Sequence, residues 1–235
     1  MAAILAAVIT LHTFPGRPGL ESLSPFCMKV EVYLKARKLP YRTILGNPRA
    51  GPKQKLPFIE VDGQRIADSA TILEHFEKSD GALDAGLDEV LRARAHVIRR
   101  TFEEGLYFVM LWSRWAEDAS WAVMKGSFDA VPAALRFVVA PIVRGVIVKS
   151  TVAQGTGRHS RDEIYAIGAR DLAAVSALLG EEPFFTGNTL RTIDLVAYAF
   201  LANIVRFEVD TPLKEAAARH PNLGRFVDRM GQALA

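Results

Sequence analysis

The first eighty residues alternate between strand-like and helix-like hydrophobic patterns. Ala7–Leu11 is a short, β-branched apolar run that predicts a buried strand, and Tyr41–Leu45 predicts a second one. Between them, Ser24-Pro25 begins a segment with apolar residues at helical spacing. Serine is favoured at the N-cap of a helix and proline at its first position, so we expect a helix to start there.

The same stretch ends in a hairpin and a second helix. Phe58–Val61 and Arg65–Ile66 are short apolar runs separated by Asp62-Gly63, a dipeptide typical of tight hairpin turns. Asp68-Ser69 then begins another helical pattern. A helix between two strands favours a parallel pair, and the hairpin adds an antiparallel edge, so we expect an α/β unit.

Strand patterns stop after the segment Ser79–Ala82, which predicts a linker. We therefore predict two domains, an α/β domain over residues 1–80 and an all-helical domain over residues 86–235. The predicted helices of the second domain are Asp88–Ala116, Val131–Lys149, Ser160–Leu179, Thr192–Phe207 and Asn222–Leu234.

Charge and cysteine content narrow the range of functions. The formal net charge is only +3, from 29 basic and 26 acidic residues, and no basic run alternates with aromatic residues, so we expect no nucleic-acid partner. The single cysteine, Cys27, excludes an intrachain disulfide and favours a cytoplasmic protein. The scattered histidines give no metal-ligand spacing, so we expect no metal.

Two apolar stretches need to be weighed as membrane segments. Met1–Leu11 is too short to span a bilayer and has no basic flank. Val131–Val148 is longer but contains Arg136 and Arg144, and a charge near the bilayer centre costs at least about 2.5–3.5 kcal/mol. We therefore expect no transmembrane segment. A buried or groove-lining helix is the favoured interpretation of Val131–Val148, with contact to a membrane surface as the alternative.

The segment Ser24-Pro25-Phe26-Cys27 could carry chemistry. Backbone N–H groups and the positive end of the helix dipole converge at a helix start and stabilise an anion such as a thiolate. Ser24 replaces the first cysteine of a C-x-x-C redox site, so a dithiol cycle is excluded, but its hydroxyl could donate to a bound thiolate. The alternative is that Ser24 only caps the helix and Cys27 is only a small buried hydrophobe.

Two further segments suggest a peptide-binding edge. Proline at position 57, just ahead of a strand, could be cis and could leave the backbone of Leu56 available to an extended ligand. Asp68-Ser69 offers N–H groups and a hydroxyl at a helix start, which is suited to a carboxylate. The simpler interpretation is that Asp68 or Ser69 just caps that helix.

These three segments, in this order and spacing, resemble the N-terminal thioredoxin-like domain of the glutathione S-transferase family. The resemblance implies that Ser24 contacts the sulfur of glutathione. It implies that Leu56 and Pro57 pair with the cysteinyl part and that Asp68 and Ser69 bind the γ-glutamyl end. A basic residue nearby would pair with the glycyl carboxylate, and among Lys53, Gln54 and Lys55 we name Lys55 as the candidate.

The back half resembles the C-terminal domain of the same family. Gly187–Asp194 is similar to the start of a central helix in that bundle, although Arg191 occupies the position where a capping serine or threonine is usual. The Trp112–Trp115 and Gly157–Ser160 segments, with the long loop before Ser24, resemble the metaxin and failed-axon-connections branch. Members of the wider family are often dimers, so the resemblance, and not the sequence itself, suggests a homodimer.

The resemblance implies a glutathione S-transferase of the detoxifying kind, in which a glutathione thiolate, stabilised by Ser24, attacks an apolar electrophile. The electrophile would lie between the domains against Tyr107, Trp112 and Trp115, although aromatic residues at helical spacing also suit a bundle core. A non-catalytic binding or adaptor protein is the alternative, with the Trp-rich apolar stretch 112–148 as a partner or membrane-surface face. A third hypothesis makes Cys27 a nucleophile.

Overall fold

A computed structural model describes residues 8–128 and 131–234, and contacts within the chain divide it into two units. The first unit contains the chain up to Ala95, the segment Pro183–Asn203 and the chain from Phe226 onward. The second contains His96–Glu182 and Ile204–Arg225. These units group residues by contact, whereas the predicted domains 1–80 and 86–235 divide the chain by sequence, so those boundaries stay a prediction.

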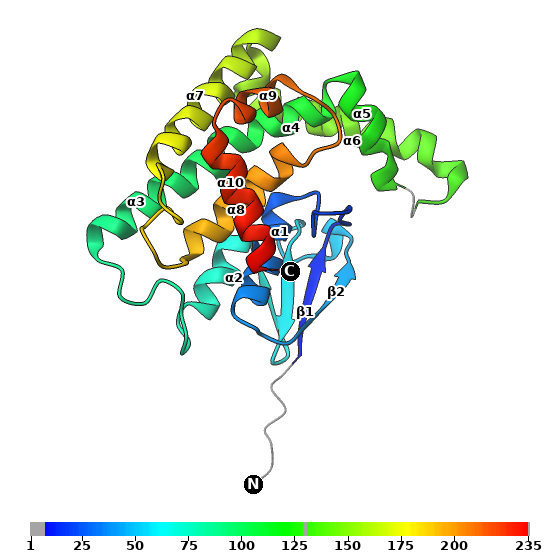
Figure 1. Ribbon diagram of the computed structural model, residues 1–235. Coiled ribbons are helices and arrows are strands. Elements are labelled where there is room, and N and C mark those ends of the chain that lie inside the picture. Colours follow the sequence, from blue (N-terminus) through cyan, green and yellow to red (C-terminus); the bar gives the residue numbers. More distant parts are fainter. Residues whose placement is uncertain (1–7, 129–130, 235) are drawn as a thin grey trace. The chain divides into compact units, whose positions relative to one another are not determined.

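A mixed sheet forms the centre of the first unit (Figure 1). Among the described residues its strands are β1 (Ile9–Thr13), β2 (Tyr41–Leu45), β3 (Phe58–Val61) and β4 (Gln64–Ala67), in the order β2-β1-β3-β4. β1 is parallel to β2, and both β1–β3 and β3–β4 are antiparallel. The predicted parallel pair and hairpin are confirmed, and the sheet is that of a thioredoxin-like domain.

The first strand begins later than predicted. β1 pairs residue for residue with the whole of β2, from Ile9 opposite Tyr41 to Thr13 opposite Leu45. The hydrogen-bond register therefore carries the strand past the apolar run and into His12 and Thr13. Ala7, where the predicted strand began, lies outside the described residues.

The helices of the first unit start where the capping residues predict. α1 (Pro25–Ala36) has Ser24 as its N-cap, and α2 (Ser69–Phe76) has Asp68. The unit also includes the first part of α3 (Glu89–Arg100) and most of α8 (Thr192–Val205) and α10 (Pro221–Ala233). Every residue of α8 from Thr192 to Asn203 is buried, so this helix is a central part of the core.

Two aspartates anchor the start of α8. The buried carboxylate of Asp194 accepts hydrogen bonds from the backbone N–H groups of Phe185 and Arg191, both at 2.8 Å. Asp84 accepts from the backbone N–H of Thr192 at 2.9 Å and from its hydroxyl at 2.5 Å. The cap that Arg191 cannot supply by its side chain is thus provided from the segment that follows α2.

The second unit is helical. The predicted helix Asp88–Ala116 is divided into α3, a π-helical segment (Thr101–Leu106) and α4 (Tyr107–Trp115). The unit also contains α5 (Asp118–Met124), α6 (Ala133–Gln154), α7 (Arg161–Leu179) and α9 (Pro212–Ala218). Short 3₁₀ turns lie at Pro48–Ala50 in the first unit and at Lys125–Phe128 and Thr156–Arg158 in the second. The helices α5 and α9, each of seven residues, were not predicted because they are too short for a clear period.

Close contact at Gly168 helps to order this bundle. A Cβ at Gly168 on α7 would come within 2.7 Å of Leu213 on α9 and 2.8 Å of Val109 on α4. Glycine therefore lets three helices approach one another at this point. The absence of a side chain, rather than an apolar period, brings α7 close to its neighbours.

Helix α6 corresponds to the predicted segment Val131–Val148 with shifted ends. It starts at Ala133, continues to Gln154, and passes through Pro141 and Gly145 without a break. Only Ala140 and Thr151 are buried, while one side of α6 lines a groove, so the groove-lining form of the favoured interpretation is confirmed and the fully buried form is not. Within the described residues, no helix is both long enough and apolar enough to cross a membrane.

Candidate functional site

Three of the predicted segments meet at one end of the sheet. β1 and β4 run in the same direction because each is antiparallel to β3, so both of them end where β3 begins. The loop leading to Ser24 follows β1, Pro57 immediately precedes β3, and Asp68 immediately follows β4. Phe58 pairs with His12 on one side and Ala67 on the other, which aligns these ends. The topology thus brings together residues separated by more than forty positions.

Ser24 caps α1 with its side-chain oxygen. Its Oγ accepts a hydrogen bond from the backbone N–H of Cys27 at 3.4 Å. Its own backbone N–H donates to Oγ of Ser22 at 3.2 Å, and the Ser22 hydroxyl donates to the carbonyl of Phe14 at 3.0 Å. The capping role of Ser24 uses its oxygen as an acceptor, so its O–H can still donate to an anion at the helix start.

Asn203 holds the loop that precedes Ser24. This fully buried amide on α8 donates to the carbonyl of Ser22 at 3.2 Å and to that of Ala199 at 2.9 Å, and its Nδ2 lies 3.3 Å from the sulfur of Met28. Asn203 therefore fixes the backbone two residues before the cap. Sequence reasoning missed it, although a lone asparagine within the apolar run of α8 is a departure that could have drawn attention.

Cys27 is completely buried beneath the helix start. Burial raises the pKa of its thiol, although hydrogen bonds from the backbone of Phe14 and the side chains of Ser24, Thr13 and Ser22 act in the opposite direction. A thiol that is buried and protonated is a poor nucleophile. This geometry favours the structural interpretation of Cys27 over the nucleophilic one.

The Leu56-Pro57 peptide bond is cis. The side chain of Leu56 is buried in a cluster with Cys27, Phe58 and Ala67, against which Phe14 packs. Within the part of the chain that the structure describes, no hydrogen bond engages the backbone N–H or C=O of Leu56. These groups are therefore available to an extended peptide ligand, as the sequence predicts.

Lys55 directly precedes this segment and is exposed. No hydrogen bond or ion pair between described residues involves its ammonium group. It is thus a cation near the end of the sheet that could pair with a carboxylate. Lys53 is also exposed, so the structure does not separate the two candidates.

Asp68 and Ser69 lie at the start of α2. The carboxylate of Asp68 accepts from the backbone N–H of Ala70 at 3.0 Å and of Thr71 at 3.4 Å, so Asp68 is the cap. Its backbone adopts a φ of +82°, which is uncommon for a residue other than glycine. Ser69 is buried, and no hydrogen bond among the described residues uses its hydroxyl. The cap is thus supplied by Asp68, and the hydroxyl of Ser69 is not used for it.

The predicted substrate-binding aromatics lie on α4, and each packs against other aromatic rings. The ring of Tyr107 packs against Phe108, with centroids 5.1 Å apart, and that of Trp112 packs against Tyr165 of α7 at 5.8 Å. Trp115 is buried beside Trp121 of α5, at 5.6 Å, and beside Phe128. Each ring thus has aromatic neighbours within its own unit, as a bundle core requires.

The arrangement at the end of the sheet suits a small peptide with a thiol and two carboxylates. It offers the hydroxyls of Ser24 and Ser69, the backbone of Leu56 and a nearby lysine. Across residues 8–128 and 131–234, no group of three or more histidine, cysteine or acidic side chains is placed to hold a metal ion. The chemistry available here is therefore that of hydrogen-bond donors and helix starts.

Comparison with known proteins identifies the two halves of the chain. A model of the glutathione S-transferase N-terminal domain matches residues 25–120, and one of the glutathione S-transferase C-terminal domain matches residues 168–230. Failed axon connections of Drosophila melanogaster is 32% identical and aligns with 95% of this chain, which spans only 57% of that protein's length. An isoprene-epoxide–glutathione S-transferase of Rhodococcus sp. strain AD45 is 29% identical, covering 95% of this chain and 98% of that one. Mouse metaxin-2 is 23% identical, covering 92% and 84%.

Solved structures with a similar fold agree with these matches. A β-etherase from Sphingobium sp. strain SYK-6 superposes with a TM-score of 0.67 at 14% identity, covering 97% of this chain and 98% of that one. A glutathione S-transferase of Methylobacterium radiotolerans, solved with glutathione sulfonate, gives a TM-score of 0.56 at 21% identity, covering 94% and 89%. With a thioredoxin-like sheet, a helical second half and these matches, the chain belongs to the glutathione S-transferase family, near its metaxin and failed-axon-connections branch.

Proposed function

We propose that this protein binds glutathione at the end of the sheet and transfers it to an apolar electrophile. The observation that carries the proposal is the meeting of Ser24, cis-Pro57 and Ser69 where β1 and β4 end and β3 begins. The relatives whose names include glutathione transferase activity support it.

In the proposed mechanism, the backbone of Leu56 pairs with the cysteinyl residue of glutathione as a short strand. The hydroxyl and backbone N–H of Ser69 hold the γ-glutamyl carboxylate at the start of α2, and Lys55 pairs with the glycyl carboxylate. These contacts hold the thiol beside Ser24.

The thiol then loses its proton to solvent, and the O–H of Ser24 donates to the thiolate, which lowers the thiol pKa. The start of α1 adds the favourable end of a helix dipole. The thiolate sulfur forms a bond to an electrophilic carbon, and the electron pair of the broken bond leaves with the departing group or with the oxygen of an opened epoxide. The name of the Rhodococcus relative makes an epoxide the first electrophile to try.

The decisive test of binding is calorimetric titration with reduced glutathione. We expect binding by the wild type and a clear loss of affinity in Ser69→Ala, because a hydroxyl held for a carboxylate would be removed. Ser79→Ala, a serine just beyond α2, is the control and should bind normally. If a folded wild-type protein shows no binding of glutathione, the proposal is wrong.

The role of Ser24 needs a control for stability, because loss of an N-cap alone costs about 1 kcal/mol. Ser160 caps α7 in the second unit through a complete capping box, so Ser160→Ala removes a comparable cap far along the chain. We expect Ser24→Ala to lower the glutathione-conjugating rate and Ser160→Ala to leave it unchanged. Equal rates in the two variants would remove Ser24 from the mechanism.

A non-catalytic binding protein is the second candidate, and the exposed apolar side of α6 favours it. It predicts that deletion or mutation of that side abolishes association with a partner and leaves glutathione binding intact.

Three further expectations stay proposals: the contact of Tyr107, Trp112 and Trp115 with an electrophile, the homodimer, and the cytoplasmic location. Saturation kinetics of aromatic variants, light scattering and microscopy of the tagged protein would test them in turn.

A further inference from the structure

The outer side of α6 carries a strip of exposed apolar side chains. Between Ala133 and Val146 every residue in the exposed class is apolar. The strip consists of Leu135, Val138, Ile142 and Val146, which we call the α6 outer face. Val146 is 62% exposed, Ile142 61% and Leu135 55%. Single exposed apolar residues are ordinary, but a continuous row of large ones marks a surface that contacts something apolar.

The spacing makes this row a single face. Leu135, Val138, Ile142 and Val146 follow one another at intervals of three and four residues, so they lie along one side of three helical turns. At about 1.5 Å per residue the row is roughly 16 Å long. The opposite side of the helix contains Ala140 and Thr151, which are buried. The inner side of α6 thus packs against the rest of the second unit, and its outer side is apolar and exposed.

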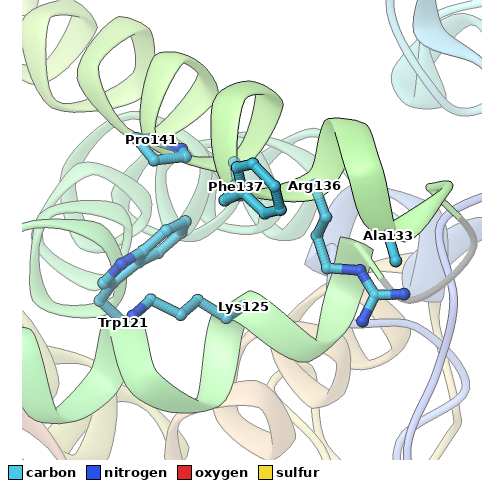
Figure 2. A pocket seen from close by; sticks show the side chains of 7 residues that line it. Trp121, Lys125, Ala133, Arg136, Phe137 and Pro141 are labelled. Atoms are coloured by element: carbon cyan, nitrogen blue, oxygen red, sulfur yellow. The ribbon is translucent and has the colours of Figure 1, made fainter.

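A separate groove lies between α6 and α5. It has a volume of about 460 Å³ and is lined by Trp121, Lys125, Ala133, Arg136, Phe137, Ala140 and Pro141. Figure 2 shows Trp121 and Lys125 on one wall and Phe137 and Pro141 of α6 on the other, with Arg136 reaching across between them. Phe137 is 74% exposed but lies about 140° around the helix from Ile142, so it belongs to the groove and not to the outer face.

The charges on α6 itself have one sign. Helix α6 contains Arg136, Arg144 and Lys149 and no acidic residue. Arg144 is used internally, since it donates to the carbonyls of Trp115 and Ala116 at 2.8 and 2.7 Å and to Asp118 at 2.8 Å. Lys149 is exposed at the C-terminal end of the outer face. The natural complement is an apolar surface that carries negative charge.

Two other occupants fit less well. A second copy of this chain would set α6 against α6, which contains no acidic residue to pair with Lys149. An acidic peptide needs a concave apolar groove along its length, whereas the outer face is the convex side of a helix. A lipid bilayer accepts a convex apolar ridge and supplies negative headgroups around it.

We propose that the α6 outer face docks onto the surface of an anionic lipid bilayer. Val138 and Ile142 would enter the boundary between headgroups and acyl chains, and Lys149 would contact the headgroups, with the helix lying in the plane of the surface. This docking is separate from the proposed glutathione site, which belongs to the other unit. It would bring the protein to the bilayer where apolar electrophiles concentrate, or where a partner is anchored.

The test is co-sedimentation of the full chain with vesicles. We expect binding to vesicles of phosphatidylcholine with an equal amount of phosphatidylserine, weaker binding to pure phosphatidylcholine, and weakening by salt. Val138→Ser and Ile142→Ser should each reduce the partition coefficient by about tenfold, as removal of a large buried apolar group implies. Lys149→Glu should reduce binding to the anionic vesicles by about fivefold or more and leave binding to neutral vesicles unchanged.

Val97→Ser is the matched control, because Val97 on α3 is 61% exposed, as Ile142 is. It should bind vesicles like the wild type. Absence of vesicle binding by a folded wild-type protein would overturn the proposal, as would equal loss in Val97→Ser and Ile142→Ser. Dimerisation in light scattering that Ile142→Ser abolishes would assign the face to a second copy instead. Titration of the same variants with glutathione tests the proposed function separately, because a variant that loses vesicle binding should still bind glutathione.

Discussion

The end of the sheet and the outer face of α6 place polar and apolar groups in opposite ways. At the end of the sheet, apolar residues such as Ile59 and Cys27 are buried, and polar groups such as those of Ser22 and Ser24 are joined by hydrogen bonds. On α6 the large apolar side chains face solvent, while Arg144 turns back to bind carbonyl groups. The first region buries its apolar groups and leaves the backbone of Leu56 and the hydroxyl of Ser69 without partners among the described residues, whereas the second leaves its apolar groups in solvent.

This difference suggests where each region obtains its specificity. A hydrogen-bonded helix start can recognise a small polar ligand, because each donor has a fixed direction. Apolar contacts have no preferred direction, and their strength grows with the area removed from water. An exposed apolar row therefore suits an extended apolar surface. The two proposals for this protein follow from these two kinds of surface.

The largest contrast should come from the same substitution in both regions. Ile59 on β3 is completely buried and Ile142 on α6 is 61% exposed. We expect Ile59→Ala to lower the free energy of unfolding by about 2–5 kcal/mol, because it leaves a cavity in the core. Ile142→Ala should change it by less than about 0.5 kcal/mol. Urea unfolding measures both, and a large loss in Ile142→Ala would show that α6 is covered by the protein itself.

The next largest effect concerns a buried polar group. Asp194→Ala would leave the backbone N–H groups of Phe185 and Arg191 without their acceptor, so we expect a loss of about 2–5 kcal/mol. The control is Asp162→Ala, whose side chain is 97% exposed and whose removal should cost under about 0.5 kcal/mol. Similar melting temperatures for the two variants would mean that apolar contacts alone anchor α8.

The pH dependence of stability tests the role of the buried Asp194 carboxylate in a second way. Burial raises the pKa of Asp194 from 3.8 to about 7, although hydrogen bonds from Phe185 and Arg191 oppose the shift. The folded state then binds a proton that the unfolded state has lost, so this contribution to stability is complete below pH 3.8 and disappears as the pH rises through about 7. We expect the wild type to lose stability relative to Asp194→Asn between pH 5 and pH 8. A constant difference across that range would show that Asp194 is ionised throughout.

A matched pair of glycines gives the smallest effects. A Cβ at Gly51 would lie 2.5 Å from the carbonyl oxygen of Lys55, whereas one at Gly145 on α6 would meet nothing within 4 Å. Gly51→Ala should cost about 1–3 kcal/mol and weaken glutathione binding, because it displaces the segment before Leu56. Gly145→Ala should be neutral or stabilise by up to about 1 kcal/mol, since alanine favours a helix. Unchanged glutathione affinity in Gly51→Ala would separate that segment from the ligand.

Much of the first unit could be predicted from local patterns. The strand Tyr41–Leu45 and the helix starts at Ser24 and Asp68 were predicted at the residues where they occur, because β-branched runs and capping residues act over a few positions. The short helices α5 and α9 and the π-helical segment could not be predicted. A helix of two turns has too few apolar positions to show a period.

The sequence named residues of the candidate site, and their roles toward a ligand stay predictions. Ser24, Leu56, Asp68 and Ser69 were named, and the structure gives the cap to Asp68 and leaves the hydroxyl of Ser69 without a partner among the described residues. Asn203, which holds the loop before Ser24, was not named. Its partner Ser22 lies 181 positions away, and no local pattern reports such a contact.

The sequence by itself determined the strands, the capped helices and the family, because each depends on neighbouring residues or on a recognisable order of segments. Only the tertiary structure decided which segments lie together and which side chains are buried. The strand directions brought Ser24, Pro57 and Ser69 to one end of the sheet. The packing of α6 left Phe137 and Ile142 exposed, although their apolar character suggested burial. Burial is a property of the whole fold, because a side chain is removed from water only by residues that arrive from elsewhere in the chain.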